Sequence, residues 1–188
     1  AALALFQGTW TIDDAARLLE PELDRNQVSD LVLDLANRSL IAPQVRIGPE
    51  SRAAFTMFDV LRRHALAKLD DSELAADMRE RHARATARAI ADVAAQVRAR
   101  GMRREYRMLD RLADAHAALR WFLAHDPDHA TRLACDLGDF YKGILRFAEG
   151  EHVLEGVLDH IRPTGVERAD VLSRLAFFRH PLSDIGAE

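Results

Sequence analysis

Cysteine is nearly absent from this chain, and long apolar runs are missing. Cys135 is the only cysteine among 188 residues, so the chain can form neither an internal disulfide nor a zinc site built from several thiolates. We therefore expect a protein of a reducing compartment, the cytoplasm, in which Cys135 is a small buried residue. No apolar run approaches the roughly 18 residues that span a bilayer, so we expect no membrane contact.

The chain also lacks a strong charge of either sign. Its formal net charge of −4 gives no general attraction to nucleic acid or to an anionic membrane. The basic residues gather in the middle of the chain, over residues 61–125, whereas the segments on either side carry more acidic than basic groups. The chain begins at Ala1 without an initiator methionine, so we expect it to be a fragment of a longer protein.

The sequence signatures of common catalytic and metal sites are absent as well. No G-x-x-x-x-G-K-[ST] loop occurs, so we expect no nucleotide cofactor bound by this fragment. The eight histidines show no His-Glu-x-x-His pattern, so we expect no metal site. Neither a serine elbow nor a pair of carboxylates with catalytic spacing stands out. The sequence therefore predicts a chain that is not an enzyme.

The first 68 residues combine helix patterns with one hairpin pattern. Thr11 precedes two aspartates and predicts the N-cap of a helix that runs to about Glu20. Apolar spacing over residues 28–36 predicts a second helix that ends near Arg38. Residues 40–47 and 54–57, separated by a Gly-Pro turn at 48–51, predict a β-hairpin, and we expect no other strand. This order, with a further helix from Phe58, is typical of a winged-helix domain over residues 1–68.

The remainder of the chain has helical periodicity throughout. A long helix rich in alanine and arginine is predicted from Asp70 to about Arg100, where Gly101 interrupts it. A second long helix is predicted over residues 103–125, with Leu109 on its apolar side, and it stops before Pro127. Antiparallel helix pairs follow. We therefore expect a mainly α chain with a helical, tetratricopeptide-like domain over residues 69–188.

The segment 137–163 resembles one tetratricopeptide repeat. In such repeats, small residues let two antiparallel helices approach, and aromatic residues fill the space between the helices. The matching positions are Leu137, Gly138, Tyr141, Phe147, Gly150, Leu154, Val157, Leu158 and Pro163.

A longer resemblance runs from Leu3 to about Leu158. It is carried by the stretches LALFQGTWTIDDAARLL, VSDLVLDLANRSLI, FTMFDVLRRHALAKL, RHARATARAIA and LDRLADAHAALRWFLAHDPDHATRLACDLGDFYKGILRFAEGEHVLEGVL. In content and order these stretches resemble the region after the nucleotide-binding core of STAND-type bacterial regulators, the large ATP-dependent LuxR-like and SARP-like transcriptional regulators. The resemblance implies an upstream ATPase module that binds ATP or ADP, a winged-helix module that helps to close it, and a downstream tetratricopeptide-like module that binds a partner.

Met57-Phe58-Asp59 lies at the predicted junction between hairpin and helix. Plant disease-resistance proteins of the same broad class carry Met-His-Asp there, and the histidine senses the phosphates of the bound nucleotide. In this chain Phe58 takes the place of that histidine, and a phenyl ring cannot donate a hydrogen bond. Two interpretations remain open. In one, Phe58 is a core ring and Asp59 caps the next helix; in the other, the junction packs in a nucleotide-dependent way.

The one dense basic cluster surrounds Gly101. It could meet a phosphate or an acidic partner surface, or it could be a solvated helix end whose cations are favoured by the helix dipole. Its members are Arg98, Arg100, Arg103, Arg104, Arg107 and Arg111.

A winged helix also suggests an alternative function, a DNA-binding protein with a dimerising helical tail. The candidate recognition helix would expose Asp30 and Asp34, whose carboxylates repel a phosphate backbone. We therefore expect DNA contact through this chain to be unfavourable. The basic residues around that helix and the wing are Arg25, Arg38, Arg46 and Arg52, with Glu50 beside the last two.

Phe177 and Phe178 are adjacent, so a single helix face cannot bury both rings, and we expect an exposed apolar edge or a dimer contact there. With Tyr141 they complete the partner-binding candidates. The sequence predicts a non-catalytic hinge and protein-interaction module of an ATP-dependent switch in transcription. Its partner would be another protein or the ATPase domain of the same chain, and a homo-oligomer is a further expectation.

Overall fold

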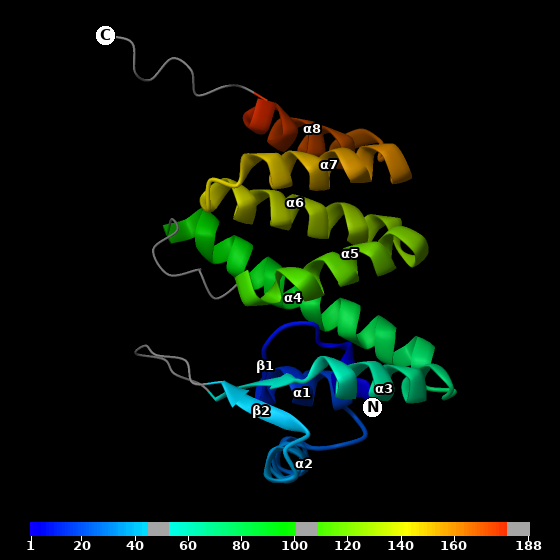
Figure 1. The fold of residues 1–188 in the computed structure, drawn as a ribbon. Coiled ribbons are helices and arrows are strands. Elements are labelled where there is room, and N and C mark those ends of the chain that lie inside the picture. Colours follow the sequence, from blue (N-terminus) through cyan, green and yellow to red (C-terminus); the bar gives the residue numbers. More distant parts are fainter. Residues whose placement is uncertain (45–52, 101–108, 180–188) are drawn as a thin grey trace. The chain divides into compact units, whose positions relative to one another are not determined.

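The computed structural model describes residues 1–44, 53–100 and 109–179 (Figure 1). Helices dominate these ranges, and a small three-stranded antiparallel sheet accompanies them, which confirms the predicted mainly α class. The chain packs into two compact units. One unit holds Ala1–Thr86 and Leu109–Ala118. The other holds, among the described residues, 87–100 and 119–179. No helix in these ranges is long and apolar enough to cross a membrane.

The first unit combines short helices with the sheet. Thr11 caps its first α-helix as predicted: the Thr11 hydroxyl accepts from the backbone N–H of Asp14 at 3.2 Å, and the Asp14 carboxylate accepts from the backbone N–H of Thr11 at 2.9 Å. Asp24 caps the second helix in the same way. The elements are η1 (Ala2–Leu5), β1 (Trp10–Thr11), α1 (Ile12–Leu19), α2 (Arg25–Asn37), β2 (Ile41–Gln44), β3 (Ala54–Met57) and α3 (Asp59–Asp70).

The sheet has β3 in the centre, between β1 and β2. The β2–β3 pairing, with Ile41 opposite Met57, confirms the predicted hairpin; its expected residues 45–51 lie outside the described part of the chain. The expectation of no other strand was wrong, because Trp10 pairs with Phe55. A two-residue strand is too short to show a period-2 pattern. The Trp10 side chain is fully buried, 5.5 Å from the Phe55 ring by centroids, and anchors this strand in the core.

The second unit is an array of helices. α4 (Ala75–Arg100) and α5 (Leu112–His125) contribute their later halves to it. α6 (Pro127–Gly143), α7 (Phe147–Ile161) and α8 (Gly165–Arg179) follow and run in alternating directions (Figure 1). α6 and α7 approach closely at Gly138, where a Cβ would lie 3.4 Å from Leu154 Cδ1. Buried core residues on these three helices include Leu133, Leu137, Phe140, Leu154, Val157, Val171 and Leu175.

Two predicted helix starts differ from the structure. α4 begins at Ala75 and not at Asp70, because α3 continues through Asp70 and the Ser72 hydroxyl donates to the Leu69 carbonyl at 2.7 Å. α5 begins at Leu112, after a 3₁₀ turn over residues 109–111; the earlier part of the predicted helix, 103–108, lies outside the described residues. Leu109, expected on the apolar side, is exposed.

Candidate partner-binding surface

The Met57-Phe58-Asp59 junction does not form the predicted core contact and cap. The Phe58 side chain is 54% exposed. Phe58 itself occupies the N-cap position of α3, with no side-chain cap hydrogen bond, and Asp59 is already the first helical residue. The Asp59 carboxylate lies 3.7 Å from a guanidinium nitrogen of Arg62, one turn later on the exposed surface. The interpretation of Phe58 as a core ring and of Asp59 as the cap was therefore wrong, because α3 already begins at Asp59 and its N-cap position falls on the exposed Phe58.

The two arginines of the basic cluster whose side chains are described are held in ion pairs within the protein. In the second unit, Arg98 donates to Asp136 at 3.1 Å and to Asp139 at 2.7 Å. In the first unit, Arg111 donates to Asp14 at 2.5 Å. Both guanidinium groups thus have structural partners. The side chain of Arg100 and all of Arg103, Arg104 and Arg107 lie outside the described part of the structure.

A buried polar contact that the sequence did not predict joins the start of the chain to α5. The carboxylate of Asp114, almost fully buried, accepts from the backbone N–H of Gln7 at 2.6 Å and from that of Gly8 at 3.4 Å. The Nε2 atom of His82 on α4 lies 3.4 Å from the same carboxylate and is also buried. No local pattern marks these residues, since the partners lie far apart in the sequence.

The backbone of Gly8 fits closely against this segment. A Cβ at Gly8 would lie 1.9 Å from the carbonyl oxygen of Asp110, closer than any real contact. The loop before β1 can therefore approach only because residue 8 has no side chain. Together with the Arg111–Asp14 ion pair, this loop fixes the 110–114 segment to the first unit. The burial of Asp114 and the hydrogen-bond partners of the Asp14 and Asp114 carboxylates indicate a structural role.

An ionic cluster holds three helices of the second unit together. Asp139 on α6 accepts from Arg98 of α4 and from Arg174 of α8, the latter at 3.1 Å. Burial raises the pKa of the neighbouring Asp136, and its hydrogen bond to Arg98 opposes that rise. Cys135 lies beside this cluster and is buried, as predicted, and burial raises the pKa of its thiol to about 11. A protonated, buried thiol is not a nucleophile.

Aromatic and cationic side chains meet where the α6–α7 turn lies beside the last turns of α8. The rings of Phe177 and Phe178 each lie 6.1 Å from that of Phe147, and 5.8 Å from each other. The Lys142 ammonium stands 3.7 Å from the centre of the Phe177 ring, within cation–π distance. We name these four residues, together with the exposed Leu145 of the turn, the aromatic–cationic cluster.

Part of the aromatic–cationic cluster faces solvent. Phe177 is 38% exposed and Leu145 is 71% exposed, which confirms the expected apolar edge at Phe177. The predicted candidate Tyr141 lies beneath this surface: its side chain is buried, and burial raises the pKa of its hydroxyl. Of the three aromatic candidates, the structure therefore exposes Phe177, leaves Phe178 half-buried beside it and places Tyr141 in the core.

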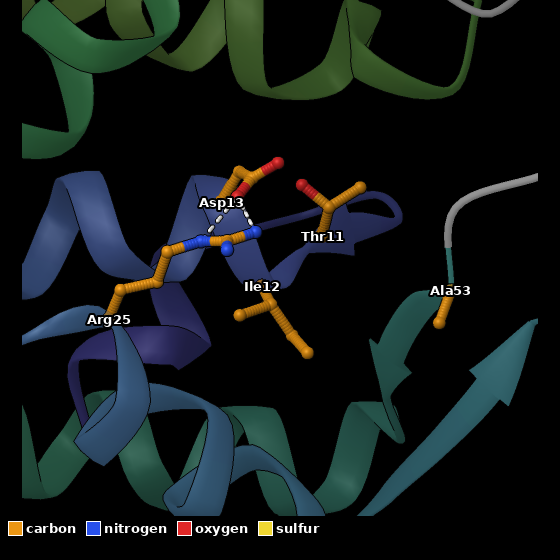
Figure 2. Close-up of a pocket in the computed structure, with 5 residues that line it drawn as sticks. All are labelled: Thr11, Ile12, Asp13, Arg25 and Ala53. Carbon is orange, nitrogen blue, oxygen red and sulfur yellow. Dashed lines mark hydrogen bonds and ion pairs between the residues drawn. The ribbon is translucent and has the colours of Figure 1, made fainter. Parts of the chain in front are cut away.

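An open hollow of about 320 Å³ lies at the start of α1 (Figure 2). Its floor holds Ile12, and Ala53 stands across the opening from Thr11. The Arg25 guanidinium turns toward Asp13 and donates to it at 2.7 Å, so its charge is already compensated. An anion entering here would have to displace a carboxylate, which argues against an anion site.

Among the described residues, no group of three or more His, Cys, Asp or Glu side chains could hold a metal ion. The aromatic–cationic cluster is thus the part of the described structure where predicted partner-binding residues meet at the surface.

No family model, curated protein or solved structure matches this chain.

Proposed function

We propose that this chain is a non-catalytic regulatory and protein-interaction module of an ATP-dependent transcriptional regulator of the STAND type. The resemblance of the stretches between Leu3 and Leu158 to that class supports the regulatory part. The observation that carries the interaction part is the exposure of Phe177 and Leu145 beside Lys142. Aromatic residues are enriched in the cores of protein interfaces.

The arrangement of the first unit supports a winged-helix module in this proposal. A short helix, a strand, two helices and a hairpin follow one another, and the sheet order is β1-β3-β2. In the same way, the alternating helices α6 to α8, with a small residue at the α6–α7 approach, support a tetratricopeptide-like module. The partner of the second module is proposed to be a protein, and the first module is proposed to pack against the ATPase domain.

The nucleotide would be sensed indirectly in this proposal. Phe58 at the junction carries no hydrogen-bond donor, so this side chain cannot bind a phosphate as a histidine would. Its ring is exposed, next to the exposed Val60. These two side chains instead offer an apolar contact to the neighbouring ATPase domain in one of that domain's nucleotide states. A change in nucleotide state would then shift how this surface packs.

A DNA-binding protein is the alternative function, since the element order above is also that of DNA-binding winged helices. The charges of α2 oppose it. Asp30 and Asp34 are both exposed, and the exposed Arg38 is held by Asp34 at 2.9 Å. Fluorescence anisotropy with duplex DNA at low salt tests this point. DNA binding that weakens steeply as the salt concentration rises would favour the alternative over our proposal. We expect no binding.

Two experiments test the proposal: sequencing of the reading frame that encodes this chain, and a transcription reporter assay of variants. We expect a G-x-x-x-x-G-K-[ST] loop encoded N-terminal to Ala1, and its absence would overturn the ATP-dependent part. In the encoded regulator, Phe177→Ser should abolish most of the reporter response. Leu74→Ser, at an exposed apolar position of the first unit outside the Met57-Phe58-Asp59 junction, serves as the control for the second module's surface. An unchanged response in Phe177→Ser, with the protein folded, would overturn the interaction surface.

A further inference from the structure

The turn between α6 and α7 is a complete Schellman motif. The backbone N–H of Arg146 donates to the carbonyl of Tyr141 at 3.0 Å. The backbone N–H of Leu145 donates to the carbonyl of Lys142 at 3.2 Å. Together these bonds close the end of α6 and place Leu145 in the left-handed region, with a φ of 60°. Glycine is the usual residue at this position, because a Cβ in this conformation is sterically unfavourable.

Leu145 carries two costs in the isolated chain. Its backbone is strained, and its apolar side chain is 71% exposed. The other non-glycine residues with positive φ in the described ranges, Ser39 and Arg162, are polar. Glycine in place of this leucine would remove both costs and leave the hydrogen bonds of the turn intact. Strained residues cluster at ligand-contacting sites, which makes Leu145 a candidate contact residue.

Phe177 is turned outward beside this turn by the packing of Phe178. A Cβ at Gly150 of α7 would lie 2.5 Å from the Phe178 ring, so this ring fills the space over Gly150. Adjacent residues on a helix point in different directions, so Phe177 cannot enter the same space. Its ring is 38% exposed, and the Lys142 ammonium stands 3.7 Å from the centre of the ring.

Lys142 differs from the arginines of the same segments in its charge partners. The Arg146 guanidinium donates to Glu149 at 2.7 Å, and that of Arg179 donates to Glu151 at 2.9 Å. Lys142 forms no ion pair with any carboxylate in the described ranges. The aromatic ring beside it meets only one side of an ammonium group that has three N–H donors. A carboxylate from outside can therefore pair with Lys142 without displacing an existing ion pair.

We propose that the aromatic–cationic cluster binds an acidic, apolar peptide segment of a partner protein. Apolar side chains of the segment cover Leu145 and Phe177, and a carboxylate pairs with the Lys142 ammonium. The inference rests on the interaction surface proposed above and adds the chemistry of the partner. A basic segment would bring its charge against Lys142 and is disfavoured. So small a surface gives weak binding, and we expect a Kd of about 0.1 to 1 mM at low salt.

Two synthetic peptides test the preference for acidic segments. One is a blocked amphipathic peptide of leucine and glutamate, and the other carries lysine in place of glutamate. In NMR titrations of the isotope-labelled chain, the glutamate peptide should shift the amide signals of Leu145 and Phe177. The lysine peptide should bind at least about tenfold more weakly. Because the net charge of the chain is −4, general attraction would favour the lysine peptide, so a preference for glutamate has to be local.

The other lysine of the chain supplies the matched control for the charge. Lys142→Glu should reverse the preference between the two peptides. Lys68→Glu makes the same charge change at an exposed position of α3, in the first unit, and should leave the preference unchanged. A Lys142→Glu variant that still prefers the glutamate peptide would overturn the role of this ammonium.

Leu145→Gly separates a contact role from a structural role. The variant should lose most of its binding to the glutamate peptide. It should also melt higher by about 2 to 4 °C, because glycine relieves the left-handed strain. Leu74→Gly, at an exposed position of the first unit, should leave the binding unchanged. A Leu145→Gly variant that binds as tightly as the unmodified chain, or that melts at a lower temperature, would overturn the contact role.

The transcription reporter distinguishes a failure of this inference from a failure of the proposed function. A response lost in Phe177→Ser but normal in Lys142→Gln would overturn the acidic partner and leave the interaction surface in place. A response unchanged in Phe177→Ser would overturn the surface itself. Three binding results would each overturn the acidic partner: equal binding of both peptides, no binding near 1 mM, and a Leu145 signal that shifts with protein concentration alone, since a second copy would then occupy the surface.

Discussion

The carboxylate of Asp114 accepts a hydrogen bond of 2.6 Å from the backbone N–H of Gln7, a residue 107 positions earlier in the chain. The contact is almost completely removed from water, since Asp114 is only 3% exposed. A backbone donor in such a place needs an acceptor, because an unpaired buried N–H is costly. Asp114 therefore holds the beginning of the chain against α5, within the first unit.

Removing this acceptor should destabilise the fold. We expect Asp114→Ala to lower the free energy of unfolding by about 1.5 to 3 kcal/mol, the range for a hydrogen bond to a charged group. Urea denaturation measures the change. Asp30→Ala, at an exposed position of α2, is the control and should change the free energy by no more than about 0.5 kcal/mol. Equal effects of the two substitutions would contradict a structural role for the Asp114–Gln7 bond.

Gly8 and Gly156 should respond in opposite directions to alanine. At Gly8 a Cβ would meet the Asp110 carbonyl at 1.9 Å, so Gly8→Ala must move backbone and should lower the melting temperature strongly. At Gly156, inside α7, nothing lies within 4 Å of the added Cβ. Gly156→Ala should stabilise the protein by about 0.5 to 1 kcal/mol through helix propensity. A Gly8→Ala variant as stable as the original chain would show that the loop before β1 does not need this close approach.

The sequence predicted the features that depend on a few neighbouring residues. Thr11 and Asp14 are three positions apart, so the capping box at α1 could be predicted from their spacing alone. The β2–β3 hairpin similarly joins two nearby segments with a turn signal between them. The burial of Cys135 follows from the usual preference of a free thiol for the interior.

Features that depend on distant segments could not be predicted in this way. β1 is recognised as a strand only because Trp10 meets Phe55, 45 positions later. One of the two interpretations of the junction placed Phe58 in the core, yet the ring is exposed at the turn into α3. In the candidate surface, Lys142 and Phe177 come from different helices, so no local spacing could have paired them. Tyr141 is buried and Phe177 is exposed, although the sequence grouped both as partner-binding candidates.

The caps of α2 and α3 should differ in their sensitivity to alanine. The Asp24 side chain accepts from the backbone N–H groups of Asn26 and Gln27, so Asp24→Ala should cost about 0.5 to 2 kcal/mol. Asp59 caps nothing, and its exposed contact with Arg62 is long, so Asp59→Ala should cost less than about 0.5 kcal/mol. Melting curves of the two variants compare them directly. A larger loss of stability in Asp59→Ala than in Asp24→Ala would show that Asp59 caps α3, as the sequence suggested.

Cys135 should react only after the protein unfolds. Because burial raises the pKa of its thiol to about 11, the native thiolate is scarce at pH 8. Relative to an ordinary thiol with a pKa of about 8.5, its reaction with a disulfide reagent should be slower by roughly 200-fold from ionisation alone. The unfolded thiol loses its proton first as the pH rises, so this group's contribution to stability is present below about pH 8.5 and declines toward pH 11. Labelling in native buffer and in concentrated urea measures the two rates, and equal rates at pH 8 would show that Cys135 is not buried.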